Sequence, residues 1–113
     1  MAAKIPLVFF RTANGSEPVR EWLKDLAPED RKIVGQDLQR LQYRWPVGMP
    51  LARALGKGLW EVRSNLTGGR IARVIFCFHG SELVALSAFI KKSQKTPQGE
   101  LDLALDRKKE LEQ

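Results

Sequence analysis

The sequence predicts an α+β domain, with a compact antiparallel sheet, an αα-hairpin on one face of it and a helix at the C-terminus. Two observations predict this class. Three segments with the character of strands follow one another between residues 60 and 90, joined by short turns that contain glycine. Segments with apolar residues at helical spacing precede and follow them. The predicted order of elements is β-α-α-β-β-β-α.

Size and composition favour one soluble domain over residues 1–113, since 43% of the residues are hydrophobic and 28% are charged. The 19 Lys and Arg residues outnumber the 13 Asp and Glu residues, which gives a net charge of +6. Such an excess favours a nucleic acid or an acidic protein as partner, and simple solubility is the alternative. The single cysteine, Cys77, excludes a disulfide framework and fits a cytoplasmic protein. We expect neither a signal peptide nor a membrane span.

The N-terminal half is predicted to supply one strand and two helices. Residues 5–11 are expected to form the opening strand, with a turn after it. Ser16 is expected to cap the first helix, and Pro28 to open the second. The two helices share an apolar stripe that we expect to lie against the sheet as core, its tryptophans included: Val19, Trp22, Leu23, Leu26, Ile33, Val34, Leu38, Leu41 and Trp45.

A loop is predicted between the second helix and the sheet, because Pro46, Gly48 and Pro50 are unsuited to a continued helix. This loop is expected to extend as far as Gly58. Residues 60–64 then alternate between apolar and charged side chains, the pattern of a strand covered on one face.

The central strand is predicted at residues 71–78, which are apolar on both faces apart from Arg73. A tight turn around Gly80 leads to a third apolar segment, residues 83–90. Thr96 and Pro97 are expected to cap the C-terminal helix.

Arginine and lysine side chains on these strands are the candidate functional residues. A guanidinium on an apolar strand, as at Arg73, costs several kcal/mol unless it is paired or solvated at a site. Arg63 on the preceding strand, with the cluster Lys91, Lys92 and Lys95 at the exit of the last strand, would complete an anion-binding face suited to a polynucleotide backbone. Consecutive lysines on a strand point to opposite faces, so Lys91 and Lys92 share a site only if the strand has ended.

Cleavage of RNA is a reaction that such a face can support, because the 2′-hydroxyl of RNA is itself the nucleophile. The protein must align that hydroxyl, stabilise the charge on the phosphorane and transfer protons. A lysine crowded by cations could transfer protons. Glu61 could be a general base or the ionic partner of Arg63 or Arg73, and the ionic role is favoured.

Several other kinds of site are not supported. One His and one Cys do not make a zinc site, and no cofactor is expected. His79 lies beside a turn glycine and is more typical of a solvated hairpin than of a catalytic triad. Lys57 lies between two glycines, but this segment precedes a strand instead of opening a helix, unlike a phosphate-binding loop.

The segments LWEVR, IARVIF and FIKKSQKTP, together with the N-terminal FFRTANGSEPVREWLKDL, resemble toxins of the RelE/HigB superfamily, in particular the phage-derived Gp49-like (HigB-type) branch. The resemblance covers nearly the whole chain. It implies a microbial-ribonuclease-like fold and a metal-independent toxin that cleaves mRNA in the ribosomal A site. It also implies a helix-turn-helix antitoxin as partner.

By this resemblance, Arg73 matches the arginine that holds the scissile phosphate, and Arg63, Lys91 and Lys92 match other basic residues of the active site. Lys57, Arg70 and Lys95 are predicted to bind RNA. The C-terminal tyrosine of some relatives is missing, since the only tyrosine is Tyr43. His79 or Glu61 could replace it in proton transfer.

The sequence therefore predicts a ribosome-dependent mRNA endoribonuclease, the toxin of a type II toxin–antitoxin pair. Two alternatives remain open: a ParE-like toxin that binds DNA gyrase, and a non-catalytic module that binds RNA or antitoxin.

Overall fold

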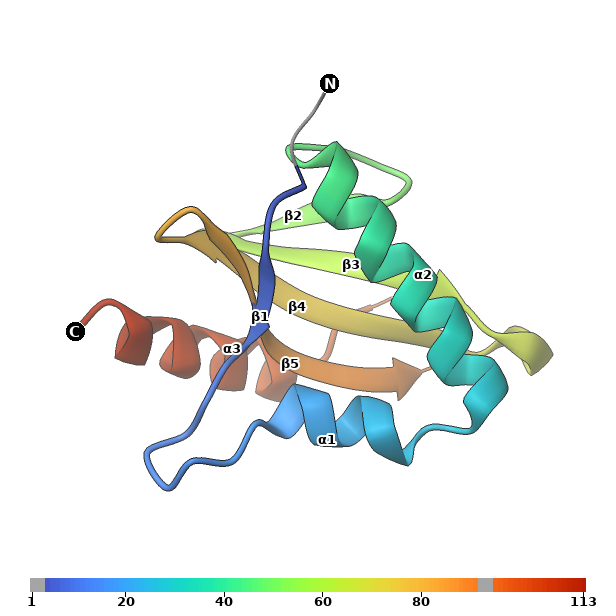
Figure 1. Cartoon of the computed structure of the whole chain (residues 1–113), viewed down its shortest axis with the longest axis horizontal. Coiled ribbons are helices and arrows are strands. Elements are labelled where there is room, and N and C mark those ends of the chain that lie inside the picture. The colour runs from blue at the N-terminus through green and yellow to red at the C-terminus, as the bar shows by residue number, and fades with distance from the viewer. Residues whose placement is uncertain (1–3, 92–94) are drawn as a thin grey trace.

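The computed structural model describes residues 4–91 and 95–113 and confirms the α+β class (Figure 1). The described elements are β1 (Leu7–Phe9), α1 (Pro18–Asp25), α2 (Pro28–Arg44), β2 (Ala52–Gly56), β3 (Leu59–Asn65), a 3-10 turn η1 (Thr67–Gly69), β4 (Ile71–His79), β5 (Glu82–Lys91) and α3 (Gln98–Leu111). They form a five-stranded sheet in the order β1-β5-β4-β3-β2.

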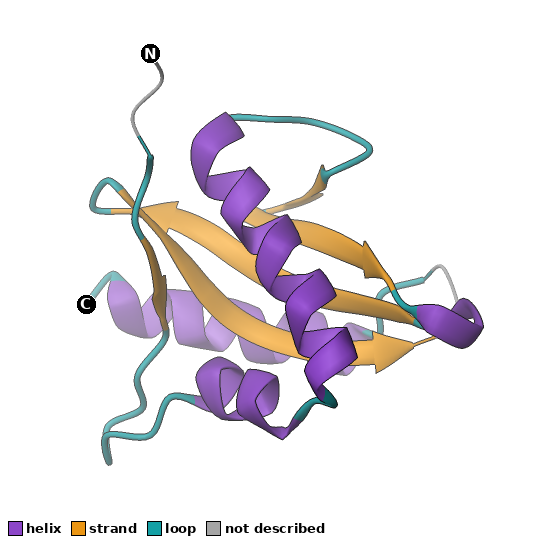
Figure 2. Cartoon of the chain, turned by 45° about the vertical axis from the view of Figure 1, so that its right-hand side comes forward, coloured by secondary structure: helices purple, strands orange, loops and turns teal. Residues whose placement is uncertain are grey.

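Helices cover both faces of the sheet, with α1 and α2 on one side and α3 on the other (Figures 1 and 2). Val62, Val74 and Phe76 pack with the apolar stripe of α1 and α2. Ile75 and Cys77, the alternate residues of β4, pack with Ala104 of α3. The prediction of an αα-hairpin on one face is confirmed, and the side chains of β4 alternate between two cores because it is the central strand.

The segment between α2 and β3, which was predicted to be a loop, contains a strand. Residues 52–56 form β2, which pairs antiparallel with β3, so that Ala52 faces Val62 and Arg53 faces Glu61. The element order is therefore β-α-α-β-β-β-β-α. Only Ala52 is buried in this short edge strand, so its hydrophobic alternation is too weak to be recognised in the sequence.

The sheet is mixed and not purely antiparallel, because β1 runs parallel to β5 with Leu7 opposite Leu83. The backbone N–H of Leu83 donates to Pro6 O at 2.9 Å, and that of Phe10 donates to Ala85 O at 2.9 Å. The two strands are separated by two helices and three strands, and a pattern within one segment carries no information on its partner or its direction.

The two predicted helix caps are not formed. The hydroxyl group of Ser16 lies 2.7 Å from that of Thr12, and α1 begins after Glu17 without a side-chain cap. Thr96 directs its hydroxyl to the sheet, and α3 likewise begins without a side-chain cap, after Pro97. Each hydroxyl has a tertiary or turn partner in place of the helix backbone.

The indole of Trp45 packs edge-on against Trp60 and Phe76, at ring-centroid distances of 5.0 and 5.4 Å. Trp22 also packs against this core. The interpretation of both helical tryptophans as core residues is confirmed.

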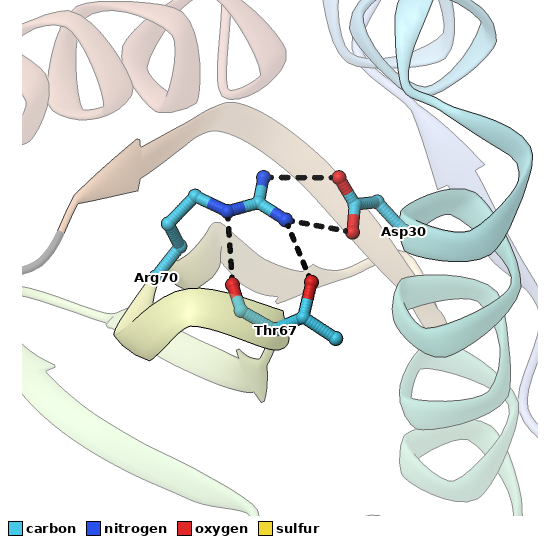
Figure 3. A network of polar contacts seen from close by, with 3 residues as sticks. All are labelled: Asp30, Thr67 and Arg70. Carbon is cyan, nitrogen blue, oxygen red and sulfur yellow. Dashed lines mark hydrogen bonds and ion pairs between the residues drawn. The ribbon is translucent and has the colours of Figure 1, made fainter.

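An ion pair fixes the β3–β4 connection to the start of α2 (Figure 3). Arg70 donates to both carboxylate oxygens of Asp30, at 3.0 and 3.1 Å. The same guanidinium donates to the carbonyl oxygen of Thr67 at 3.0 Å and to its hydroxyl at 3.3 Å. The hydrogen bond to Asp30 raises the pKa of Arg70, and its planar fork holds two chain segments together.

Among the described residues, no helix is long and apolar enough to cross a membrane.

Removing either member of this ion pair is expected to lower Tm, because both side chains bridge η1 and α2. We expect Arg70→Ala and Asp30→Ala each to lower Tm, and the double variant to lower it by less than the sum of the two. Thermal unfolding followed by circular dichroism measures this, with Arg20→Ala as control because its contact with Glu17 lies at an exposed i,i+3 position. Strictly additive changes would contradict the coupling.

Cys77 gives a second prediction, since burial raises its pKa to about 11. The unfolded thiol ionises near pH 9, so the unfolded state gains stability first as the pH rises above that value. The stability advantage of the wild type over Cys77→Ala is therefore present below pH 9 and is expected to shrink by about 2 kcal/mol towards pH 11. Urea unfolding of both proteins from pH 8 to pH 11 measures the difference, and a constant difference would contradict the prediction.

Candidate functional site

Two neighbouring strands bring the predicted charged residues together. In the register of β3 and β4, Arg63 lies directly opposite Arg73, while Glu61 lies opposite Ile75. Residues two apart on a strand share a face, so all three charged side chains lie on the face that α3 covers. With Thr96, which precedes α3, they form what we call the arginine cluster.

Thr96 connects the members of this cluster. The Arg63 Nε donates to Glu61 Oε1 at 3.1 Å, and the Thr96 hydroxyl donates to Glu61 Oε2 at 2.5 Å. The Arg73 Nη1 donates in turn to the Thr96 hydroxyl at 3.5 Å. The contact between Glu61 and Arg63 is the ionic role favoured by the sequence.

The cluster is buried beneath Arg63. The residues Glu61 and Arg73 are 0% exposed and Thr96 is 7% exposed, whereas the Arg63 side chain is 21% exposed. Burial lowers the pKa of Arg73, and the neighbouring charge of Glu61 opposes that shift. Of the three charged members two are cationic, so the cluster carries a local excess of positive charge that would stabilise an anion at its surface.

Arg53 is a neighbour that the sequence reasoning missed. It is exposed on β2 directly opposite Glu61, which places it on the same face as the arginine cluster. Its positive charge is close enough to contribute to the lowered pKa of Arg73. The short alternation of Ala52, Arg53 and Ala54 is too weak a signal to predict the strand that positions Arg53.

Two of the predicted lysines lie beside the cluster. Lys91 is the exposed last residue of β5, opposite Ile71, and Lys95 is exposed directly before Thr96. Arg53, Lys91 and Lys95 thus add exposed cations next to the arginine cluster. Lys92 lies outside the described residues.

Two predicted residues lie at the other end of the sheet. His79 ends β4 and pairs with Glu82, six residues along the strand from Arg73 and thus about 20 Å away. Lys57 lies in the β2–β3 hairpin with a φ of 55°, and the adjacent Gly58 lies close to Lys108 of α3. The structure therefore does not bring Lys57 and His79 together with the cluster.

Arg70 lies at the same end of the sheet as the cluster, but its guanidinium is engaged by Asp30 and Thr67 (Figure 3).

Within residues 4–91 and 95–113, no group of three or more His, Cys, Asp or Glu side chains could hold a metal ion.

Comparison with known proteins identifies the family. Residues 21–109 match the family described as "Phage derived protein Gp49-like (DUF891)", a range that includes the whole arginine cluster. The chain is also similar to two curated proteins named "Probable endoribonuclease HigB1", from Mycobacterium tuberculosis strains CDC 1551 / Oshkosh and ATCC 25618 / H37Rv. In each case the identity is 33% over 104 residues, which cover 89% of this chain and 80% of the relative. The chain therefore belongs to the phage-derived Gp49-like family, the HigB-type branch of the RelE/HigB superfamily.

Proposed function

We propose that this protein is the toxin of a type II toxin–antitoxin pair and acts as an endoribonuclease on mRNA. The observation that carries the proposal is the similarity, over 89% of the chain, to relatives named "Probable endoribonuclease HigB1". The arginine cluster supports it, because it combines a buried charged network with exposed cations in the way that binding of a phosphate backbone requires.

The proposed reaction uses the RNA as its own nucleophile. The 2′-hydroxyl loses its proton and attacks the adjacent phosphorus. The bond to the 5′-oxygen breaks and this oxygen takes up a proton, so that a 2′,3′-cyclic phosphate and a 5′-hydroxyl result. The protein has to orient these groups in line and stabilise the additional negative charge of the phosphorane. We propose that the residues around the arginine cluster do both without a metal ion or cofactor.

Arg63 is proposed to contact the scissile phosphate, since it is the partly exposed arginine of the cluster. Its hydrogen bond to Glu61 fixes the orientation of the guanidinium. Arg73 is proposed to act from beneath, where its charge strengthens the positive potential at the phosphate. Direct contact between Arg73 and the phosphate, as the family resemblance implies, stays a prediction, because the residue is 0% exposed.

Proton transfer is proposed to fall to the lysines at the exit of β5, since Lys91 and Lys95 are exposed beside the cluster. Glu61 is buried and accepts hydrogen bonds from Arg63 and Thr96, which favours its ionic role over that of a general base. The remoteness of His79 makes it a poorer candidate.

The ribosome is proposed as the place of cleavage, with the mRNA held in the A site by rRNA. A cation cluster provides charge without base-specific contacts, so an external template would have to present the stretch of mRNA that is cut. We further propose a cytoplasmic location and a helix-turn-helix antitoxin as the inhibitory partner.

Single substitutions test the roles of the two arginines. Arg63→Ala is expected to lower the mRNA cleavage rate per folded molecule by about a hundredfold, and also to lower Tm because it removes the ionic partner of the buried Glu61. Arg63→Lys is expected to recover part of the rate. Arg73→Met is expected to keep Tm close to that of the wild type, because an apolar side chain of similar volume replaces a buried cation while Glu61 keeps its hydrogen bonds from Arg63 and Thr96. We expect its rate to fall less than that of Arg63→Ala.

The same measurements define the contrary outcomes. A larger loss per folded molecule for Arg73→Met than for Arg63→Ala would show that Arg73 is the residue that contacts the phosphate. Unchanged cleavage per folded molecule in both variants would show that the active site lies outside the arginine cluster. Arg20→Ala serves as the control, since it removes an exposed cation from α1.

Expression of the protein without its antitoxin is expected to stop translation and to fragment mRNA while plasmid supercoiling continues. Purified protein is expected to bind RNA with a strong dependence on salt, and to cut mRNA efficiently only when ribosomes are present. Primer extension on translated and untranslated transcripts measures the cut sites. Loss of supercoiling with intact mRNA would favour the gyrase-binding alternative, and efficient cutting of ribosome-free RNA would contradict the role of the ribosome.

A further inference from the structure

A second basic surface begins at the arginine cluster and continues along α2. A groove of about 790 Å³ lies between α2, the loop after it and the edge of β3. Its lining includes Gln36, Arg40, Arg44, Met49, Arg63 and Asn65. Figure 2 shows the loop from α2 to β2 arching away from the helix before the chain returns to the sheet. We call this surface the α2 groove.

Arg63 belongs to both surfaces because β2 is too short to pair with this part of β3. The pairing of β2 with β3 begins at Ala52 opposite Val62, so the part of β3 from Arg63 onward is an edge of the sheet. Arg63 can therefore share the face of the arginine cluster and also line the groove that passes this edge.

The charge of the groove favours a polyanion. Its lining contains three cations, Arg40, Arg44 and Arg63, and one carboxylate, Asp37, which Arg40 contacts at 2.8 Å. The described lining thus has two more positive than negative charges. Arginine donors of this kind match phosphate oxygens, and the amide groups of Gln36 and Asn65 add donors that carry no charge.

Exposed side chains with flat or apolar surfaces accompany these cations. Met49 of the loop is 72% exposed and Tyr43 of α2 is 49% exposed. Tyr43 lines a smaller hollow of about 390 Å³ that shares Gln36, Arg40 and Arg44 with the groove. The ammonium group of Lys4 lies 5.7 Å from the Tyr43 ring centroid and adds one more cation here.

The ordinary explanation for part of this surface is a solvated helix. Arg44 in the last turn of α2 complements the helix dipole, and the contact of Arg40 with Asp37 is an i,i+3 pair. That explanation leaves the exposure of Tyr43 and Met49 and the continuity with Arg63 without a reason. Cations that follow a groove, with an exposed ring on which a base can stack, are the features of a surface that binds single-stranded nucleic acid.

We propose that the α2 groove binds the single-stranded RNA chain next to the phosphate held at Arg63. This inference rests on the proposed function and adds a second binding segment to it. Arg40 and Arg44 contact backbone phosphates, and Tyr43 stacks on a base. The groove thus positions the RNA and takes no part in the chemical step.

Binding of an RNA that cannot be cut tests this proposal apart from catalysis. The probe is a short fluorescein-labelled oligoribonucleotide with 2′-O-methyl groups at every position, and fluorescence anisotropy measures its affinity over a range of salt concentrations. The double variant Arg40→Ala/Arg44→Ala is compared with Arg20→Ala/Lys109→Ala, which removes two exposed cations outside the groove. Each double variant changes the net charge from +6 to +4, because two cations are removed.

The groove variant is expected to bind the oligonucleotide about tenfold more weakly than the control variant. Its plot of log affinity against log salt is expected to be less steep by about 1.4, since each phosphate contact on a single strand contributes about 0.7. Tyr43→Ala is expected to weaken binding by about tenfold, whereas Tyr43→Phe retains the stacking ring and the affinity. Tm values of all variants confirm that the proteins remain folded.

Three outcomes separate this proposal from its alternatives. Equal binding by the groove and control variants would show that the α2 groove does not bind RNA, even if the wild type cuts mRNA. RNA binding that depends on the groove in a protein that does not cut mRNA would uphold the groove and overturn the proposed function. A groove variant that binds RNA like the control but no longer co-purifies with its antitoxin would show that the groove binds a protein, and would overturn the proposal.

Discussion

The structure of the site depends on the burial of one guanidinium, that of Arg73, in the central strand. A buried cation costs several kcal/mol unless an opposite charge and hydrogen bonds compensate for it. Here the carboxylate of Glu61 comes from β3 and the hydroxyl of Thr96 from the segment before α3. The requirement to compensate this charge therefore joins two strands and the approach to the last helix, and it sets the orientation of Arg63.

The two faces of the sheet differ in polarity, and the candidate site lies on the face that α3 covers. On the face of α1 and α2 the core is apolar along the strands. On the other face an apolar core beneath α3 occupies one part and the arginine cluster another. Two polar contacts from β5 anchor α3: Ser87 donates to Glu100 at 2.6 Å, and Arg107 donates to Leu86 O at 2.6 Å. The helix is thus fixed on the sheet independently of the cluster, and the cluster can serve a ligand.

Arg63 is the residue at which the two basic surfaces of the molecule meet. It contacts Glu61 in the cluster and also lines the α2 groove past the end of β2. In the proposed function, an RNA chain that follows the groove arrives at the cluster, where its phosphate meets the partly exposed arginine. Affinity would then come mainly from α2 and reactivity from the strands, which is the usual separation between contacts that position a nucleic acid and contacts that act on it.

The fold class, the αα-hairpin on one face and the candidates Glu61, Arg63 and Arg73 could all be predicted from the sequence, because period-two and helical patterns are local and a charge in an apolar strand is easily recognised. The sequence did not predict the parallel pairing of β1 with β5, or the strand β2 that positions Arg53, and both became apparent only in the folded chain. The tertiary structure also separated Lys57 and His79 from the cluster and engaged Arg70 with Asp30. The physical reason is that strand register and ion-pair partners are set by contacts between segments distant in the chain, which no pattern within one segment records.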